Sequence, residues 1–151
     1  MRIYVMASSA EIERAKKMMA ALRGHGIEVV STWPEVIEQV GEANPMGAPR
    51  EQRARWAVDD LNELQQATAA WLLLPAKPST GAAVELGYAY CMAAMAAKGR
   101  ELGLPVPEYH LVVSGVETSI FTALSRHFPT DEEALAYFVL TAAEPPTNTA
   151  H

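Results

Sequence analysis

The sequence of 151 residues contains a single cysteine, Cys91, so no disulfide bond can form within the chain. This cysteine usage is typical of a reducing compartment, and we expect a cytoplasmic protein. The net charge of −6 argues against a nucleic-acid polymer as partner, because binding to a phosphate backbone requires a basic surface. A small anionic substrate is still compatible with this charge, because backbone amides and a few cations can bind it.

Long apolar runs are also missing. No run approaches the ~20 residues that a membrane span requires, and the N-terminus lacks a basic region followed by an apolar stretch. We therefore expect neither a membrane segment nor a secretory signal. The sequence has no Gly-x-Gly-x-x-Gly or Walker-type loop, and no spacing that indicates a metal site or a Ser-His-Asp arrangement. We expect a protein without a metal or other cofactor.

Half of the residues are apolar and a fifth are charged, as in an ordinary globular domain. Short apolar segments predict strands, and apolar residues at helical spacing predict helices. The expected strands span residues 2–6, 27–30, 69–74 and 109–113. The expected helices span residues 10–24, 50–67, 81–98, 119–126 and 131–140, and residues 32–49 are expected to be mostly loop.

This alternation implies βαβ crossovers, and hence a parallel sheet with helices on both faces. We predict a single-domain α/β fold of the Rossmann or flavodoxin-like kind over residues 1–142, followed by a flexible tail over residues 143–151. In such folds, ligands bind beyond the carboxyl ends of the strands. The loops at residues 7–9, 75–80 and 114–119 follow expected strands, so we expect them to meet at one edge of the sheet.

Other residues carry local expectations. Asp131 is a good N-cap residue for the last helix. Cys91 lies in an Ala-rich helix and is expected to be buried as a small hydrophobe. Trp33 and Trp56 are expected to pack in the interior, with stacking on a base as the alternative.

The segment between the third expected strand and the next helix is the most informative part of the sequence. A turn with Pro78, Ser79 and Gly81 lets the backbone approach a ligand at a helix N-terminus, whose unpaired amides and positive dipole end suit an anion. One carboxylate, Glu85, follows about one turn into the helix, among small and apolar neighbours. Such an acid is either a charge stabilised by the helix dipole or a reactive group.

Residues 78–89 read Pro-Ser-Thr-Gly-Ala-Ala-Val-Glu-Leu-Gly-Tyr-Ala, and residues 60–67 read Asp-Leu-Asn-Glu-Leu-Gln-Gln-Ala. Residues 2–9 read Arg-Ile-Tyr-Val-Met-Ala-Ser-Ser. In this order and at these intervals, the segments resemble the nucleoside 2-deoxyribosyltransferase superfamily, whose members break the N-glycosidic bond of nucleosides or nucleotides. The resemblance extends over roughly residues 1–140. The Pro-Ser-x-Gly turn adds features of the 2′-deoxynucleoside 5′-monophosphate N-glycosidases.

The resemblance implies three catalytic side chains. Glu85 would be the nucleophile, because a carboxylate near the anomeric carbon stabilises an oxocarbenium-like state and forms a glycosyl-enzyme intermediate if it attacks. Asp60 would orient a sugar hydroxyl or handle the proton that goes to the leaving base, and the family register selects it over Asp59. Tyr4 would contact the sugar or orient Glu85 through its hydroxyl, with a plain core side chain as the alternative.

The resemblance also implies that serines from three loops hold a 5′-phosphate. The matching positions are Ser8 or Ser9, Ser79 next to Gly81, and Ser119, and in that subfamily the last serine comes from the neighbouring subunit. Hydroxyls and helix-start amides suit a phosphate, whereas the Asp of free-nucleoside transferases at the position of Ser79 would repel it. For each serine alone, the alternative is a turn or cap residue.

Three functions remain open. The first is an N-glycosidase that acts on (2′-deoxy)nucleoside 5′-monophosphates through a covalent intermediate on Glu85 and captures it with water. The second is a deoxyribosyltransferase that exchanges bases, and Tyr88 favours it because the N-glycosidases have Arg there. The third is a nucleotide-binding module without turnover, which would not require both Asp60 and Glu85. The small and Met-rich helix over residues 82–97 predicts a homodimer or higher assembly, which the resemblance also implies.

Overall fold

The computed structural model describes residues 1–40, 45–117 and 119–143. Within this part of the chain, five strands form one sheet in the order β2-β1-β3-β4-β5. The strands are β1 (Arg2–Met6), β2 (Glu28–Val29), β3 (Ala69–Leu73), β4 (His110–Ser114) and β5 (Arg126–Phe128). Each neighbouring pair is parallel, which confirms the predicted α/β class. The predicted tail lies outside the described residues, apart from Ala143.

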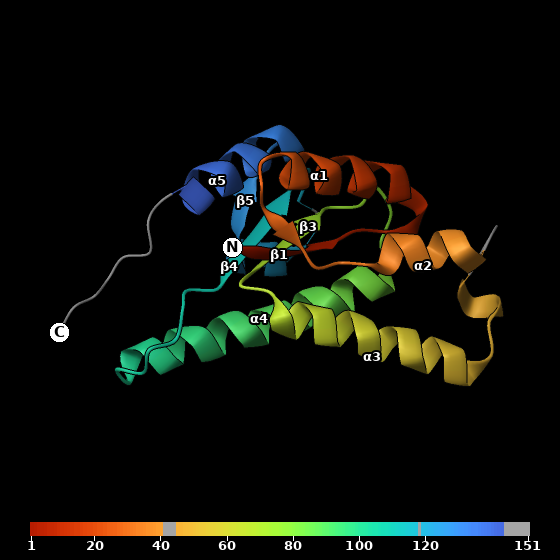
Figure 1. Cartoon of the computed structure of the whole chain (residues 1–151), viewed down its shortest axis with the longest axis horizontal. Coiled ribbons are helices and arrows are strands. Elements are labelled where there is room, and N and C mark those ends of the chain that lie inside the picture. Colours follow the sequence, from red (N-terminus) through yellow and green to blue (C-terminus); the bar gives the residue numbers. More distant parts are fainter. Residues whose placement is uncertain (41–44, 118, 144–151) are drawn as a thin grey trace.

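Helices cover both faces of this sheet. The α-helices are α1 (Ile12–Gly24), α2 (Trp33–Val40), α3 (Arg50–Gln66), α4 (Thr80–Glu101) and α5 (Asp131–Ala143). Short 3-10 turns, η1 (Ser9–Glu11), η2 (Pro45–Gly47) and η3 (Ile120–Leu124), lie in the connections. Helices α1 and α5 pack together on one face, and α3 and α4 pack together on the other (Figure 1).

The core lies between the sheet and these helix pairs. Every residue of β3 is buried, as expected for a parallel strand that is covered on both faces. From this strand, Trp71 packs against Phe138 of α5, with the ring centroids 5.4 Å apart. Truncating a buried aromatic side chain of this size costs about 3–5 kcal/mol, so this contact is a major link between α5 and the sheet.

Residues 33–40 form helix α2, where the sequence predicted mostly loop. Pro34 lies in the first turn of this helix, where its missing N–H is tolerated. The apolar residues Val36, Ile37 and Val40 recur at helical spacing after it. The loop prediction was wrong here because Pro and Gly were read as breakers along the whole segment.

Three smaller predictions were also wrong. The expected helix over residues 119–126 ends early, because Arg126 already pairs with Val112 as the first residue of β5. Asp131 is not the N-cap of α5, because the hydroxyl of Thr130 accepts a hydrogen bond from the backbone N–H of Glu133. Cys91 is exposed rather than buried.

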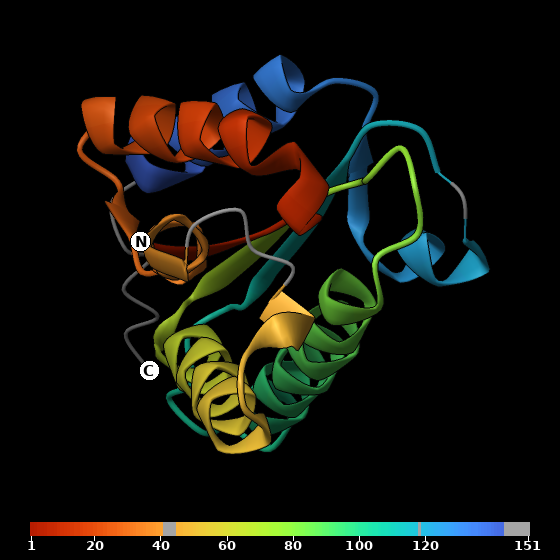
Figure 2. The ribbon, with the colours of Figure 1, turned by 90° about the vertical axis from the view of Figure 1, so that its right-hand side faces the viewer.

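The strand order places a topological switch point between β1 and β3. The chain leaves β1 toward α1 on one face of the sheet and leaves β3 toward α4 on the other. The two connections therefore diverge and leave a crevice at the carboxyl ends of these strands, which is where ligands bind in folds of this kind. Figure 2 looks onto this edge of the sheet.

Candidate active site

A cavity of about 500 Å³ lies at the carboxyl ends of β1 and β3. Its walls come from segments far apart in the sequence: the end of β1, helices α2 and α3, and the first turns of α4. The predicted site residues that line it are Ser9, Asp60, Ser79, Gly81 and Glu85. Tyr4 does not line the cavity; it is fully buried in β1, and its hydroxyl contacts Glu85. The structure therefore brings most of the predicted site together.

Glu85 lies in the second turn of α4, which begins at Thr80. Burial and then the nearby charge of Asp60 raise the pKa of Glu85 to about 8, although the hydrogen bond from Tyr4 acts in the opposite direction. A carboxylate stabilised by a helix N-terminus would instead have a lowered pKa. Of the two interpretations that the sequence allowed, the surroundings of Glu85 favour the reactive group.

The hydroxyl of Tyr4 donates a hydrogen bond to Glu85 Oε1 at 3.0 Å. Burial raises the pKa of Tyr4 well above its ordinary value, so the hydroxyl keeps its proton and remains a donor. Because Tyr4 is fully buried in β1, it holds one carboxylate oxygen of Glu85 in a fixed position. No hydrogen bond to the other carboxylate oxygen is found among the described residues, which leaves it free to react.

Asp60 faces the cavity from α3. Burial, followed by the charges of Glu63 and Asp59, raises the pKa of Asp60 to about 6. We expected only one of the two neighbouring aspartates to border the site, but both line the cavity. Asp59 is the more exposed of the two, so Asp60 is better placed to exchange a proton with a bound molecule.

Glu63 is a further acid of this region that the sequence did not single out. Its carboxylate accepts hydrogen bonds from the backbone N–H of Thr32 at 3.0 Å and from the Thr32 hydroxyl at 2.5 Å. Thr32 directly precedes α2, so Glu63 fixes the start of α2 to α3. Its position one turn after Asp60 on the same helix is the signal that would have identified it.

The serines divide between two cavities. Ser9 and Ser79 line the cavity that contains Glu85, and Ser79 also caps α4 by accepting from the Ala82 N–H at 3.4 Å. Ser8 caps η1 instead, which is the alternative that the sequence left open. Ser119 lines a second cavity of about 580 Å³ between α4 and η3, and Ser79 is also part of its wall.

Much of the wall of the first cavity is apolar. Helix α2 contributes Trp33, Val36 and Ile37, and α3 contributes Trp56. Trp33 also donates from its indole N–H to the backbone oxygen of Val5 at 2.8 Å, which fixes the ring. Trp33 is 7% exposed and belongs to the core, as expected. Trp56 is only partly buried and lines the cavity, so the stacking alternative stays open for it.

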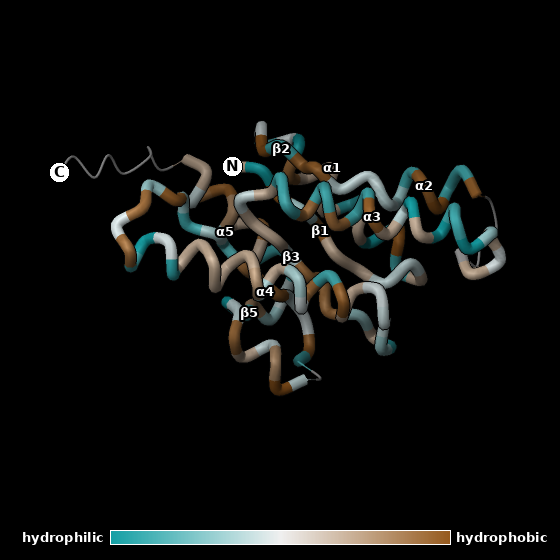
Figure 3. Tube along the Cα trace, turned by 90° about the horizontal axis from the view of Figure 1, so that it is seen from below, coloured by the Kyte–Doolittle hydropathy of each residue, from teal (hydrophilic) through white to brown (hydrophobic). Residues whose placement is uncertain are grey.

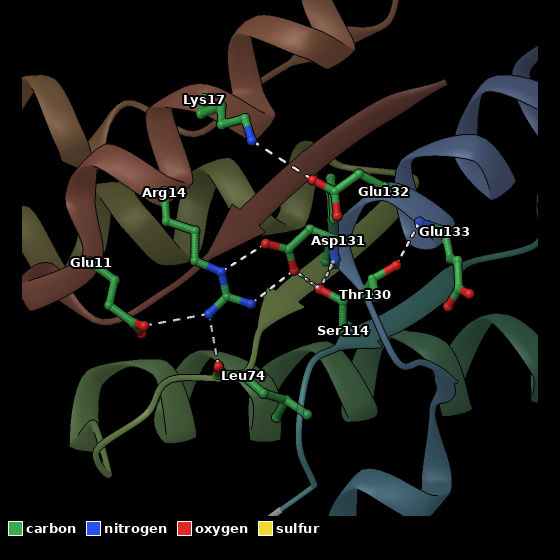
Figure 4. Close-up of polar contacts among 10 residues, drawn as sticks. Glu11, Arg14, Lys17, Leu74, Ser114, Thr130, Asp131, Glu132 and Glu133 are labelled. Atoms are coloured by element: carbon green, nitrogen blue, oxygen red, sulfur yellow. Dashed lines mark hydrogen bonds and ion pairs between the residues drawn. The ribbon is translucent and has the colours of Figure 1, made fainter.

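A second polar network fastens the neighbouring loops, as Figure 4 shows. Arg14 of α1 binds Asp131 of α5 with two hydrogen bonds of 2.7 and 2.8 Å, and it also binds the backbone oxygen of Leu74 at 2.9 Å. Ser114 donates to Asp131 at 2.6 Å and accepts from the Trp71 indole N–H at 2.9 Å. This network therefore holds the ends of β3 and β4 against α1 and α5.

Among the described residues, no group of acidic, His or Cys side chains is arranged to hold a metal ion, and no helix is long and apolar enough to cross a membrane.

Two solved structures resemble this one over almost their whole length. A 2-deoxyribosyltransferase from Bacillus psychrosaccharolyticus matches with a TM-score of 0.64 and 19% identity, covering 91% of this chain and 92% of that chain. The CMP N-glycosidase BcmB of Clostridium botulinum matches with a TM-score of 0.53 and 14% identity, covering 93% and 99%. The chain shares the fold of both enzymes. The fold implied by the sequence resemblance is thereby confirmed.

No protein-family model matches the sequence, and no curated protein is similar to it. At the identities given above, the likeness concerns the fold, so the activity has to be argued from the site.

Proposed function

We propose that this protein cleaves the bond between base and sugar in nucleoside 5′-monophosphates, preferably those of 2′-deoxyribose. The observation that carries the proposal is the cluster of Tyr4, Asp60 and Glu85 at the β1/β3 switch point. Two carboxyl groups with raised pKa values share one cavity there, as acid and base catalysis of glycosyl transfer requires. The two enzymes with the same fold support this class of chemistry.

In this mechanism, the free oxygen of the Glu85 carboxylate attacks C1′ of the sugar. The bond from C1′ to the base breaks, and the base leaves with the electron pair and takes a proton from Asp60. Water then attacks C1′ of the glycosyl ester, and Asp60 accepts its proton. The sugar phosphate is released and Glu85 becomes a carboxylate again.

The phosphate group would bind at the start of α4. The hydroxyls of Ser9 and Ser79 line this end of the cavity, and the first amides of α4, near Gly81, have no acceptors within the helix. These neutral donors suit an anion in a cavity that is otherwise acidic. Ser79→Asp should therefore weaken the turnover of phosphorylated substrates far more than that of free nucleosides, and equal losses would remove the phosphate assignment.

Base exchange is the second candidate. Two observations favour it: the deoxyribosyltransferase gives the higher TM-score of the two matches, and Tyr88 follows Gly87. In that reaction, a second base rather than water would attack the glycosyl ester. Binding without turnover is less well supported, because it gives no reason for an acid pair with raised pKa values.

We also propose that the protein forms a homodimer through α4. This helix exposes Val84 to 60% and Met95 to 70%, and Figure 3 shows few hydrophilic residues along its middle part. In η3, across the second cavity, Ile120 and Phe121 are also exposed. A partner on this surface would bury all four side chains and bring Ser119 toward a neighbouring site. Size-exclusion chromatography with light scattering tests this, and a monomer would contradict it.

The activity is tested with a substrate panel and chromatographic detection of the free base. The panel contains deoxynucleoside and ribonucleoside monophosphates and the free nucleosides, each with and without an added acceptor base. We expect release of the free base from monophosphates in the absence of an acceptor base. New nucleoside that forms only with the acceptor would identify the transferase. No base release from any substrate, together with measurable nucleotide binding, would leave only the binding function.

A further inference from the structure

One cation stands apart in the otherwise acidic and apolar cavity. Of the described residues that line the cavity, only Arg53 carries a positive charge. It forms no ion pair with Asp59, Asp60 or Glu85, and neither raised pKa in the cavity has Arg53 among its causes. Its guanidinium therefore makes no direct contact with these acids.

Among the described residues, the guanidinium has only weak hydrogen-bond partners. Its Nη1 approaches the sulfur of Met46 at 3.4 Å, and a thioether is a weak acceptor. Its Nε is buried and has no hydrogen-bond partner among the described residues. Because this nitrogen is closed to solvent, a ligand in the cavity would accept hydrogen bonds from the outer Nη atoms of the guanidinium instead.

The position of Arg53 on α3 relates it to the acids. Arg53 and Asp60 are seven residues apart on the same face of the helix, which corresponds to about 10 Å along its axis. Between them lie Trp56 and Ala57, which also line the cavity. Helix α2 lies over this N-terminal half of α3 in the view of Figure 1 and supplies apolar walls through Trp33 and Ile37.

The cavity thus has an acidic end beside the sheet, an apolar middle and a guanidinium beyond it. A nucleoside with its sugar at Glu85 would extend its planar base between the apolar walls, toward Arg53. We propose that Arg53 recognises the edge of the base that is farthest from the sugar, and selects bases that carry a carbonyl oxygen there over bases that carry an amino group. This inference rests on the proposed function, because it assumes that the sugar lies at Glu85.

The chemistry of the two groups explains the selection. A guanidinium has five N–H donors, no acceptor and a permanent charge. A 4-oxo pyrimidine or a 6-oxo purine offers it an acceptor, whereas the 4-amino or 6-amino counterpart presents a second donor. The guanidinium N–H groups and the amino group of such a base would face each other between apolar walls, and neither would find an acceptor. A site that is built to form a hydrogen bond strongly disfavours a substrate that cannot form it.

The test compares substrates that differ in this group alone. Initial rates are measured with deoxyuridine and deoxycytidine monophosphates, and with deoxyinosine and deoxyadenosine monophosphates. The wild-type protein should prefer the oxo member of each pair by about 10-fold to 100-fold in kcat/KM. Arg53→Met keeps the aliphatic stem and removes the donors, so it should lower turnover of the oxo substrates, leave the amino substrates within about threefold, and abolish the preference.

Arg55→Met is the matched control, because Arg55 lies on the same helix, is exposed and does not line the cavity. It should retain the preference. Equal losses for oxo and amino substrates in Arg53→Met would overturn the inference in favour of a structural role. A loss confined to phosphorylated substrates would assign Arg53 to the phosphate instead.

Failure of this inference can be distinguished from failure of the proposed function. If the wild-type protein cleaves all four monophosphates equally, the function stands and the role of Arg53 is wrong. If it cleaves none, calorimetric titration of Glu85→Gln with deoxyuridine and deoxycytidine monophosphates decides the matter. If the oxo nucleotide binds more tightly than the amino nucleotide, and adding Arg53→Met removes this difference, base recognition by Arg53 is supported even without the reaction. Equal binding of the two nucleotides, or no binding, would overturn the inference.

Discussion

Two clusters of carboxylates lie at the same edge of the sheet and have opposite electrostatic surroundings. Asp131 is bound by the guanidinium of Arg14 and the hydroxyl of Ser114. Burial alone would raise the pKa of Asp131, but these hydrogen bonds outweigh it and hold the pKa below its ordinary value. Glu85 and Asp60 have no cation beside them, and burial raises the pKa of both.

The difference separates a structural acid from a reactive one. A carboxylate whose charge is fully compensated fixes loops and exchanges its proton reluctantly. A carboxylate that is desolvated and lies beside another acid can exchange its proton near neutral pH, which acid and base catalysis requires. Burying Glu85 and Asp60 without a cation lowers the stability of the fold. We infer that the protein retains this arrangement because it makes the two carboxyl groups reactive. The following substitutions test this contrast, from the largest expected effect to the smallest.

Glu85→Gln should reduce base release by about 10³-fold or more, because the amide cannot form the glycosyl ester. The fold should be retained, since glutamine keeps the size of the side chain and can still accept the hydrogen bond from Tyr4. The measurement is base release under saturating substrate, with thermal unfolding as the check on the fold. Glu101→Gln, at the exposed end of the same helix, is the control and should keep full activity.

Asp60→Asn should reduce kcat/KM by about 100-fold, the contribution typical of a positioned acid or base. It should also change the pH profile. In the proposed mechanism, the active form has a charged Glu85 and a proton on Asp60. Because the pKa of Glu85 lies above that of Asp60, this is the less populated of the two forms with a single proton, and we expect a bell-shaped profile with limbs near pH 6 and pH 8. The Asp60→Asn variant should lose the alkaline limb, because it has no Asp60 carboxyl group that must keep its proton for activity. A profile that keeps both limbs would show that Asp60 is not part of the pair.

Asp131→Asn should lower the free energy of unfolding by about 2 kcal/mol at pH 7, because it leaves the partly buried charge of Arg14 without its partner. The pKa of Asp131 is lowered by folding, so its stabilisation is present above the ordinary value of 3.8 and is lost as the pH falls below it. The difference between variant and wild type should shrink in that range. Denaturant unfolding at several pH values provides the measurement.

Denaturant unfolding of Glu85→Gln at several pH values should show the opposite change: the variant should gain stability relative to the wild type as the pH rises. Folding raises the pKa of Glu85 from 4.5 to about 8, so wild-type stability decreases as the pH rises between these values. Glutamine does not titrate, and the variant should therefore become more stable than the wild type toward pH 8. If both variants lose stability equally at neutral pH, the contrast between the two clusters is wrong.

Tyr4→Phe should have the smallest effect, about a tenfold loss in kcat/KM, because one hydrogen bond to a carboxylate is removed. This bond lowers the pKa of Glu85, so the acidic limb of the pH profile should move toward higher pH in the variant. An unchanged limb would mean that Tyr4 only fills the core.

The sequence predicted the parts of this account that depend on local pattern. The buried strand at residues 69–73, the turn with Ser79 and the start of α4 place Glu85 at the correct edge without any tertiary information. Helix α2 was missed, because its breakers occupy positions that a helix start tolerates. The short strand β5 was missed, because three residues are too few to reveal a pattern of alternation.

Contacts between residues far apart in the sequence could not be predicted from local sequence patterns. The contact between Tyr4 and Glu85 joins residues 81 positions apart, and the ion pair of Arg14 with Asp131 joins residues 117 positions apart. Both depend on how the crossovers bring loops to one edge. Arg53 gave no sequence signal, because an Arg on a polar helix is usually a solvated side chain. Its buried Nε and its place in the cavity emerge only from the structure.

The central claim is that Glu85 attacks the sugar and forms a covalent intermediate. The most direct test is to cleave a deoxynucleoside monophosphate in dilute methanol and to determine the anomeric configuration of the methyl glycoside by NMR. Two successive displacements retain the β configuration of the substrate, so we expect the β-methyl glycoside. The α-methyl glycoside would show a single displacement by solvent and would contradict the role of Glu85 as nucleophile.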